Sequence, residues 1–314
     1  HSAISSADER LVSGRIDRAD RFDLRLEALL RRADARRSPA WGLESARIDL
    51  IPHQLRVAEM AASRSPLRIL LADEVGLGKT IEAGMILARL LANGRVGRVL
   101  VLLPESLVYQ WFVELLRRFN LQFSLFDEER CESIETSDPT RNPFQDEQLV
   151  MASIGFLSGS EKRASQVIAA GWDLVIVDEA HHLAWSVESA SPQYTLVEAL
   201  ASTTPGLILL TATPEQLGRS GHFARLRLLD PARYHDLETY VVEADGFGAL
   251  SGIVGKLVEG QPLSVGDCRE LAQRLGDDEE LTGLIASPLD TAGSNRLLDA
   301  LIDRHGTGRA MFRN

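Results

Sequence analysis

Short apolar runs alternate with helix-period patterns between residues 68 and 211 of the chain. The apolar runs predict strands at Arg68–Ala72, Arg98–Leu103, Gln122–Phe126, Gln148–Ala152, Leu174–Asp178 and Leu207–Thr211. The patterns between them predict helices at Lys79–Leu91, Ser106–Phe119, Ser160–Ala170 and Tyr194–Ala201. Continuous Val, Ile and Leu runs are typical of strands buried on both faces. We therefore expect an α/β fold, a mainly parallel sheet with helices on both faces.

The segments on either side of this unit have a different character. Residues 1–46 predict a polar helical connector, residues 47–240 the α/β unit, and residues 241–308 a small helical subdomain or insertion. The acidic stretch Asp127–Glu147 predicts a loop or an insertion. A basic cluster in the first segment is either a solvated face or a contact for nucleic acid or a partner; it consists of Arg31, Arg32, Arg36 and Arg37.

Composition narrows the class of protein. The chain has 314 residues, 45% of them hydrophobic and 25% charged, with a net charge of −11. This acidity argues against a uniformly basic nucleic-acid coat, but a local basic groove remains compatible with it. Cys131 and Cys268 lack paired spacing, which predicts a reducing compartment and neither a disulfide framework nor a zinc site. No apolar run approaches the length of a membrane span. Because the chain begins at His1, we expect a fragment or a processed product.

A glycine-rich turn follows the first predicted strand. It contains Asp73, Glu74, Val75, Gly76, Leu77, Gly78, Lys79 and Thr80, which match the end of a P-loop except that Asp73 replaces the first glycine. Glycines let the backbone approach a phosphate, and the following helix start offers free N–H groups. Lys79 can pair with phosphate charge, and the Thr80 hydroxyl can bind Mg²⁺. The alternative is an ordinary strand–helix turn with a surface lysine.

A second candidate element lies at the end of the strand predicted at Leu174–Asp178. Asp178 stands where open α/β sheets bind ligands and could hold Mg²⁺. Glu179 could orient and deprotonate a water molecule. The alternative is a pair of surface carboxylates, which the Gly-Lys-Thr sequence about a hundred residues earlier makes less favourable. His181 is either a structural residue or a relay of nucleotide state, and His182 is interpreted as structural.

DEVGLGKT, DEAHH and LLTATP occur in this order and resemble helicase superfamily 2, in particular its Swi/Snf class of nucleic-acid translocases. In that class an Asp at the position of Asp73 is normal. Longer strings, among them EQLG and HFARLRLLDP, resemble bacterial members that associate with RNA polymerase. The resemblance implies that residues 47–240 form a RecA-like ATP-binding lobe and that residues 309–314 begin a link to a second lobe.

The resemblance also implies roles for individual residues. Gln54 would read adenine, and Lys79, Asp178 and Glu179 would be catalytic with ATP and Mg²⁺. Coupling of hydrolysis to movement would involve His181, Thr211 and Thr213. Nucleic acid would contact Pro104, Glu105, Trp111 and Ser153. The implied partners are RNA polymerase core, double-stranded DNA and RNA, for a monomer in the bacterial cytoplasm, near the nucleoid.

No second parallel-sheet pattern and no Q-x-x-G-R-x-x-R signature follows Thr213. In the family, the second lobe supplies arginines that stabilise the transition state, and such a residue contributes about 10³- to 10⁵-fold in rate. We therefore expect weak ATP binding and almost no hydrolysis from this chain alone. The alternatives are another bacterial Swi/Snf-like translocase, for example in DNA defence, and a nucleotide-gated binding module without productive hydrolysis.

Overall fold

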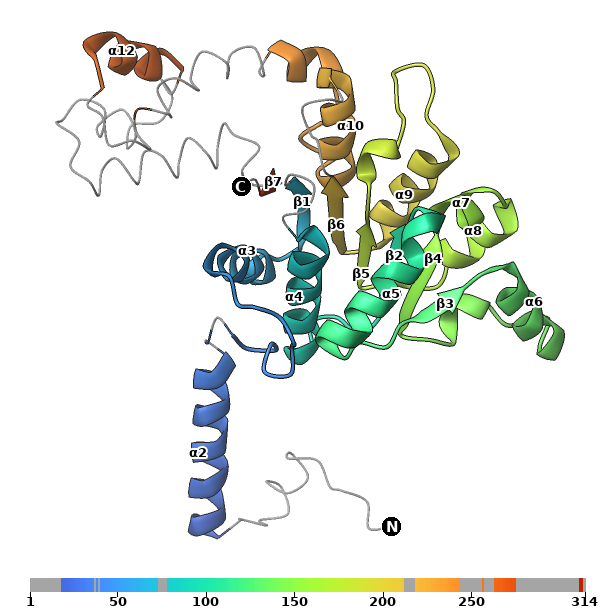
Figure 1. Ribbon diagram of the computed structural model, residues 1–314. Coiled ribbons are helices and arrows are strands. Elements are labelled where there is room, and N and C mark those ends of the chain that lie inside the picture. Colours follow the sequence, from blue (N-terminus) through green and yellow to red (C-terminus); the bar gives the residue numbers. More distant parts are fainter. Residues whose placement is uncertain are drawn as a thin grey trace, which may run out of the picture.

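The structure, a computed structural model, describes residues 18–36, 38, 40–72, 78–211, 218–242, 256, 263–274 and 311–312 (Figure 1). Its strands are β1 (Arg68–Ala72), β2 (Val99–Leu103), β3 (Ser124–Phe126), β4 (Leu149–Ser153), β5 (Leu174–Val177), β6 (Gly206–Thr211) and β7 (Met311–Phe312). Its α-helices are α2 (Ala19–Arg36), α3 (Pro52–Ser63), α4 (Lys79–Ala92), α5 (Glu105–Phe119), α6 (Glu128–Ser137), α7 (Ile154–Ser158), α8 (Glu161–Ile168), α9 (Pro192–Thr203), α10 (Gly218–Leu229) and α12 (Val265–Arg274). The 3₁₀ turns are η1 (Pro143–Gln145) and η2 (Ala180–His182).

The strands form one parallel sheet in the order β3-β4-β2-β5-β6-β1-β7. β6 lies between β1 and β5, with Ala72 paired to Thr211 and Val177 paired to Leu209. Because neighbouring parallel strands run in the same direction, β1, β6 and β5 end at the same edge of the sheet. The predicted parallel α/β fold is confirmed.

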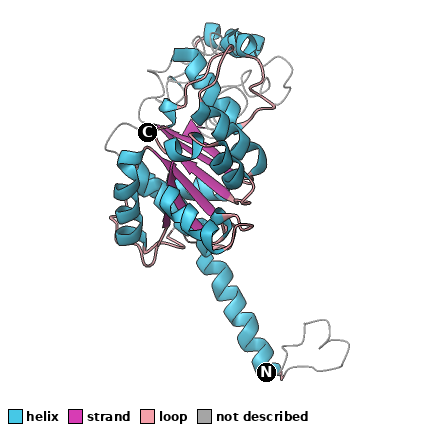
Figure 2. Ribbon diagram, turned by 90° about the vertical axis from the view of Figure 1, so that its right-hand side faces the viewer, coloured by secondary structure: helices cyan, strands magenta, loops and turns pink. Residues whose placement is uncertain are grey.

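Helices cover both faces of the sheet (Figure 2). One core cluster joins residues of α3, α4 and α5 to alternate strand positions such as Ile69 and Val101. The other joins residues of α7, α8, α9 and α10 to the remaining positions, such as Leu70 and Leu100. Successive strand residues therefore enter opposite cores, which explains why the apolar runs are continuous rather than alternating.

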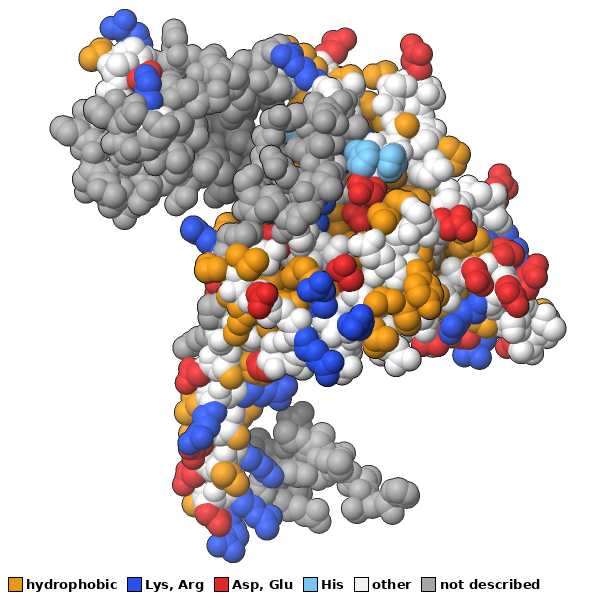
Figure 3. All heavy atoms as spheres, in the orientation of Figure 1, with side chains coloured by type: hydrophobic (Ala, Val, Ile, Leu, Met, Phe, Trp, Pro, Cys, Tyr) orange, Lys and Arg blue, Asp and Glu red, His pale blue; other side chains and the backbone are white. Residues whose placement is uncertain are grey.

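The helix α2 extends away from this body and has no buried residue (Figure 1). Apolar and charged side chains are mixed along its surface (Figure 3). The predicted polar helical connector is thus helical from Ala19 to Arg36, whereas residues 1–17 and Arg37 lie outside the described residues. Among the helices in the described ranges, none combines the length and apolar character that a membrane span requires.

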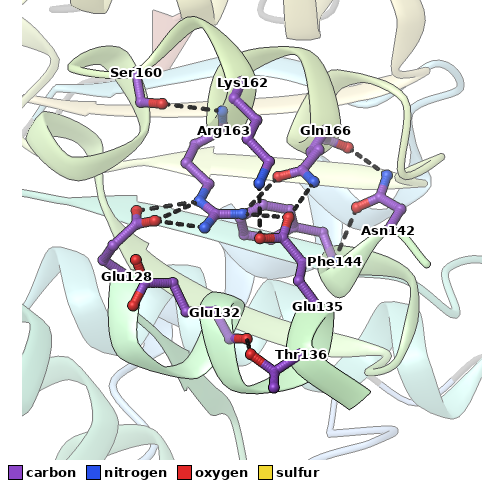
Figure 4. Close-up of polar contacts among 10 residues, drawn as sticks. All are labelled: Glu128, Glu132, Glu135, Thr136, Asn142, Phe144, Ser160, Lys162, Arg163 and Gln166. Atoms are coloured by element: carbon purple, nitrogen blue, oxygen red, sulfur yellow. Dashed lines mark hydrogen bonds and ion pairs between the residues drawn. The ribbon is translucent and has the colours of Figure 1, made fainter. Parts of the chain in front are cut away.

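The prediction of a loop at Asp127–Glu147 is wrong over its first half, where α6 forms. The Asp127 side chain caps this helix by accepting a hydrogen bond from the Arg130 amide. Arg163 of α8, whose side chain is almost fully buried, forms ion pairs with Glu128 and Glu135 of α6 (Figure 4). A cap and ion pairs therefore stabilise α6, and neither leaves an apolar period in the sequence.

Further elements that were not predicted include a short strand and a short helix. The short strand β7 extends the sheet beside β1, with Leu70 paired to Met311 and Leu71 paired to Phe312. The short helix α7 follows β4 directly, and the Ser153 side chain caps it. Of the predicted insertion at residues 241–308, only residues 241–242, Lys256 and residues 263–274, which include α12, lie within the described residues.

Candidate nucleotide site

The helix α4 begins at the end of the predicted phosphate loop. Gly78 is its N-cap residue, has φ of 91° and offers no side chain of its own as a cap. A Cβ at Gly78 would lie 2.9 Å from the Gln54 amide nitrogen, so glycine allows the close approach of Gln54. Lys79 and Thr80 occupy the first helical positions, where amide groups lack helical acceptors. The predicted residues Asp73, Glu74, Val75, Gly76 and Leu77 lie outside the described residues.

Asp178 follows β5 and has a defined donor for each carboxylate oxygen. Oδ1 accepts a hydrogen bond from the Glu179 amide at 2.8 Å. Oδ2 accepts one from the indole Nε1 of Trp111 at 2.8 Å. Burial raises the pKa of Asp178, while both hydrogen bonds and the charge of Lys79 oppose that shift. The charge of Lys79 thus acts on the Asp178 carboxylate, although the two residues are far apart in the sequence.

Glu179 has left-handed backbone geometry, with φ of 50°, at the start of η2. A non-glycine residue in this region marks a turn that the surroundings must stabilise. Its Oε2 lies 2.9 Å from Nδ1 of His181, but the two atoms are not aligned for a hydrogen bond. Burial, followed by the neighbouring His182, lowers the pKa of His181. His181 is therefore mostly neutral at pH 7.

Arg225 of α10 holds the backbone of the same turn. Its guanidinium is buried and donates to the carbonyl oxygens of Ala180 at 3.0 Å, His181 at 3.0 Å and Leu183 at 2.7 Å. Burial lowers the pKa of Arg225 to about 10, so the side chain remains charged at pH 7. Sequence reasoning missed this residue, although it lies inside the quoted string HFARLRLLDP.

Thr211 ends β6 between the strands that precede Lys79 and Asp178. Its side chain is 1% exposed, and its hydroxyl has no hydrogen-bond partner in the described part of the chain. A buried hydroxyl without a partner is costly and is often found where a group binds or moves. The second predicted coupling residue, Thr213, lies outside the described residues.

The predicted nucleic-acid residues divide into two groups. Pro104 is the N-cap residue of α5, which begins with Glu105 directly after β2. Ser153 ends β4 and caps α7, so these residues lie at neighbouring strand ends. Trp111, in contrast, is 2% exposed, and its one polar atom donates to Asp178. The Trp111 side chain thus faces the core in this structure, and its predicted contact with nucleic acid stays a prediction. Its observed hydrogen bond is with the candidate metal ligand.

These residues fit a Mg²⁺–nucleotide complex. Among the described residues, no group of three or more His, Cys, Asp or Glu could hold a metal ion. Mg²⁺ usually combines one or two carboxylates with substrate phosphates and does not need a complete protein cage. Thr80 and Asp178 would bind the ion together with the nucleotide, while Gly78 and Lys79 lie at a helix start suited to phosphate.

Comparison with known proteins identifies similar proteins. The chain is similar to proteins called "RNA polymerase-associated protein RapA": 49% identical to that of Actinobacillus pleuropneumoniae serotype 7, covering 99% of this chain and 33% of the relative. The protein of the same name from Pseudomonas aeruginosa is 48% identical, covering 98% of this chain and 32% of the relative. The chain thus spans about a third of the length of these curated relatives.

Solved structures support the fold. The "Sulfolobus solfataricus SWI2/SNF2 ATPase core in complex with dsDNA" has a TM-score of 0.54 at 17% identity, covering 86% of this chain and 45% of that chain. The "Sulfolobus solfataricus SWI2/SNF2 ATPase core domain" has a TM-score of 0.50 at 18% identity, covering 86% of this chain and 44% of that chain. At these identities the likeness concerns the fold alone. The model of the SNF2-related domain matches residues 53–246, which confirms the resemblance to the Swi/Snf class, and the chain belongs to the SNF2-related domain family.

Proposed function

We propose that this chain is the first, ATP-binding lobe of an ATP-driven nucleic-acid translocase. The observation that carries the proposal is the position of Asp178 and Glu179 at the end of β5, one strand removed from the β1–α4 junction that bears Lys79. P-loop ATPases require this combination of a phosphate-binding helix start and carboxylates on a nearby strand end.

Each residue has a separate task in this proposal. Lys79 neutralises phosphate charge, and Gln54, packed against Gly78, recognises the adenine base. Thr80 and Asp178 hold Mg²⁺, which supplies charge neutralisation on the phosphate oxygens. Glu179 orients the attacking water and accepts its proton. A protonated His181 at 2.9 Å would pair with the Glu179 carboxylate and weaken it as a base, and the lowered pKa of His181 disfavours that state.

The partners belong to the same proposal. The similar proteins are named for association with RNA polymerase, and a structure with this fold was solved with double-stranded DNA. We infer that the full-length protein, as a cytoplasmic bacterial monomer, moves along double-stranded DNA, or RNA, and acts on RNA polymerase core during its recycling. Pro104, Glu105 and Ser153 are proposed to face the nucleic acid.

The test is Glu179→Gln in the full-length protein, with Glu188→Gln as a matched control. Glu188 is exposed and lies beyond the same turn. We expect Glu179→Gln to retain nucleotide binding while ATP hydrolysis falls by at least about 100-fold, the usual scale for losing a general base. Glu188→Gln should retain both. Unchanged hydrolysis in Glu179→Gln would refute the role of Glu179.

The chain on its own provides a second measurement. Because catalytic arginines of this family lie on a second lobe, its ATP turnover should be about 10³-fold or more below that of the full-length protein. Turnover close to that of the full-length protein would refute this view. Pull-down of the full-length protein with RNA polymerase core distinguishes the proposed partner from that of a translocase in DNA defence.

A further inference from the structure

The hydrogen bond between Trp111 and Asp178 joins a core residue to the candidate metal ligand. Trp111 lies two turns into α5 and packs in the core beneath that helix. Its Nε1 donates to Asp178 Oδ2 at 2.8 Å. Buried indoles normally donate to some acceptor, so the existence of a bond is not unusual. The choice of a functional carboxylate as that acceptor is the informative feature.

A second buried tryptophan shows the ordinary arrangement. Trp172 is 4% exposed, and its Nε1 donates to the backbone carbonyl of Val167, also at 2.8 Å. The two indoles thus make hydrogen bonds of equal length from similar burial. They differ in the acceptor, which is a main-chain oxygen near α8 for Trp172 and the side chain after β5 for Trp111.

The helix α5 is itself fixed against α4. A Cβ on Gly84 would lie 2.3 Å from the ring of Phe119, so the ring at the end of α5 packs directly on the α4 backbone. α4 begins with Lys79 and Thr80. Phe119 therefore connects α5 to the helix that carries Thr80, one candidate Mg²⁺ ligand. Trp111 connects α5 to Asp178, the other candidate ligand.

We propose that Trp111 is a positioning residue: it holds the Asp178 carboxylate in the orientation that binds Mg²⁺ together with Thr80. Oδ1 is restrained by the Glu179 amide and Oδ2 by the indole, so the carboxylate cannot rotate without losing a donor. Each oxygen retains a lone pair for a metal ion or its water. Donors of this kind, one contact away from the metal, commonly contribute about 10- to 100-fold in metal affinity or activity. This inference rests on the proposed function.

The experiment compares Trp111→Phe with Trp172→Phe in the full-length protein. Both substitutions remove one buried indole N–H that donates at 2.8 Å. Binding of Mn²⁺, a spectroscopic probe for the Mg²⁺ site, is titrated by electron paramagnetic resonance in the presence of a non-hydrolysable ATP analogue. Thermal unfolding of both variants is measured in parallel. We expect the Mn²⁺ dissociation constant to rise about 10-fold in Trp111→Phe and to stay within about 2-fold of wild type in Trp172→Phe.

The possible outcomes separate the inference from the proposed function. Equal Mn²⁺ affinity in the two variants, with wild-type binding intact, would refute the role of Trp111 and leave the proposed function standing. Failure of the wild-type protein to bind Mn²⁺ with nucleotide would refute the proposed function and the inference with it. If Trp111→Phe does not fold, a benzothienylalanine at position 111 keeps the shape of the side chain without the N–H donor, and the same 10-fold weakening is expected.

Discussion

The buried guanidinium of Arg225 offers the sharpest test of how the turn after Asp178 is held. Arg225→Met keeps a long, flexible side chain but removes the donors to the carbonyl oxygens of Ala180, His181 and Leu183. These carbonyls follow Glu179 directly, and the turn begins with left-handed geometry at that residue. Loss of the donors leaves buried acceptors beside a strained residue.

The magnitude follows from two of these acceptors, because the Ala180 carbonyl also accepts a hydrogen bond from the Leu183 amide at 3.2 Å. Each buried acceptor left without a donor costs about 1–3 kcal/mol. The substitution also removes a buried charge, whose burial lowers the pKa of Arg225 to about 10, and this offsets part of the cost. Taking the lower figure for the carbonyls of His181 and Leu183 gives a loss of about 2 kcal/mol in the free energy of unfolding. For a lobe of this size, that corresponds to a fall in Tm of roughly 4–8 °C.

Arg227→Met is the matched control because it makes the same substitution on the same helix. Arg227 is 36% exposed, and its ion pair with Glu198 at 3.5 Å is of a surface type that contributes about 0–1 kcal/mol. Thermal unfolding of the chain and hydrogen exchange of the amides at residues 179–184 are the two measurements. Equal Tm values for the two variants, with unchanged exchange in the turn, would refute the assigned role of Arg225.

Two further predictions concern the phosphate loop and acid stability. Gly78→Ala should weaken binding of a fluorescent ATP analogue by about 10-fold, equivalent to ~1.4 kcal/mol, because the added Cβ would meet the Gln54 side-chain amide. Gly94→Ala is the control: Gly94 also has positive φ, but a Cβ there would meet no atom within 4 Å, so the variant should bind the analogue normally. The Arg163 hydrogen bond holds the pKa of Glu135 at about 2, below its ordinary value of 4.5. Its stabilising effect is therefore complete above pH 4.5 and disappears as the pH falls towards 2, so Glu135→Gln should flatten the fall of Tm across that range. A Gly94→Ala variant that binds as weakly as Gly78→Ala, or an unchanged pH profile in Glu135→Gln, would contradict these expectations.

The strands could be predicted because of how deeply they are buried. In β2 and β6, every residue is buried, and this burial demands an unbroken run of apolar side chains. Such a run is visible in a single sequence. The helix α6 is different, because Asp127 caps its first turn and Arg163 of α8 forms ion pairs with Glu128 and Glu135 on one of its faces. Contacts of that kind depend on residues brought together only by the fold.

The same reasoning separates the candidate metal ligand from the side chains that hold it in place. Asp178 could be predicted because it follows a buried strand directly, and its role depends on that position. The donors that hold it could not. Trp111 is 67 residues away in sequence, and Arg225 is 42 residues from Leu183, whose carbonyl it binds. A tryptophan in a helix pattern is expected in the core, and Trp111 does lie there. Its contact with Asp178 appears only when α5 packs on the sheet.

The turn after β5 is held from both layers of helices, by two different kinds of donor. Trp111 belongs to the core cluster of α3, α4 and α5, whereas α10, which carries Arg225, contributes its neighbours to the opposite cluster. A neutral indole contacts the carboxylate and brings no positive charge that would compete with Mg²⁺ for it. A guanidinium in that place would satisfy the carboxylate and repel the metal. The charged donor lies instead on the backbone of the turn, where its acceptors are carbonyl oxygens. This division predicts separable effects, with metal affinity depending on Trp111 and the geometry of Glu179 depending on Arg225.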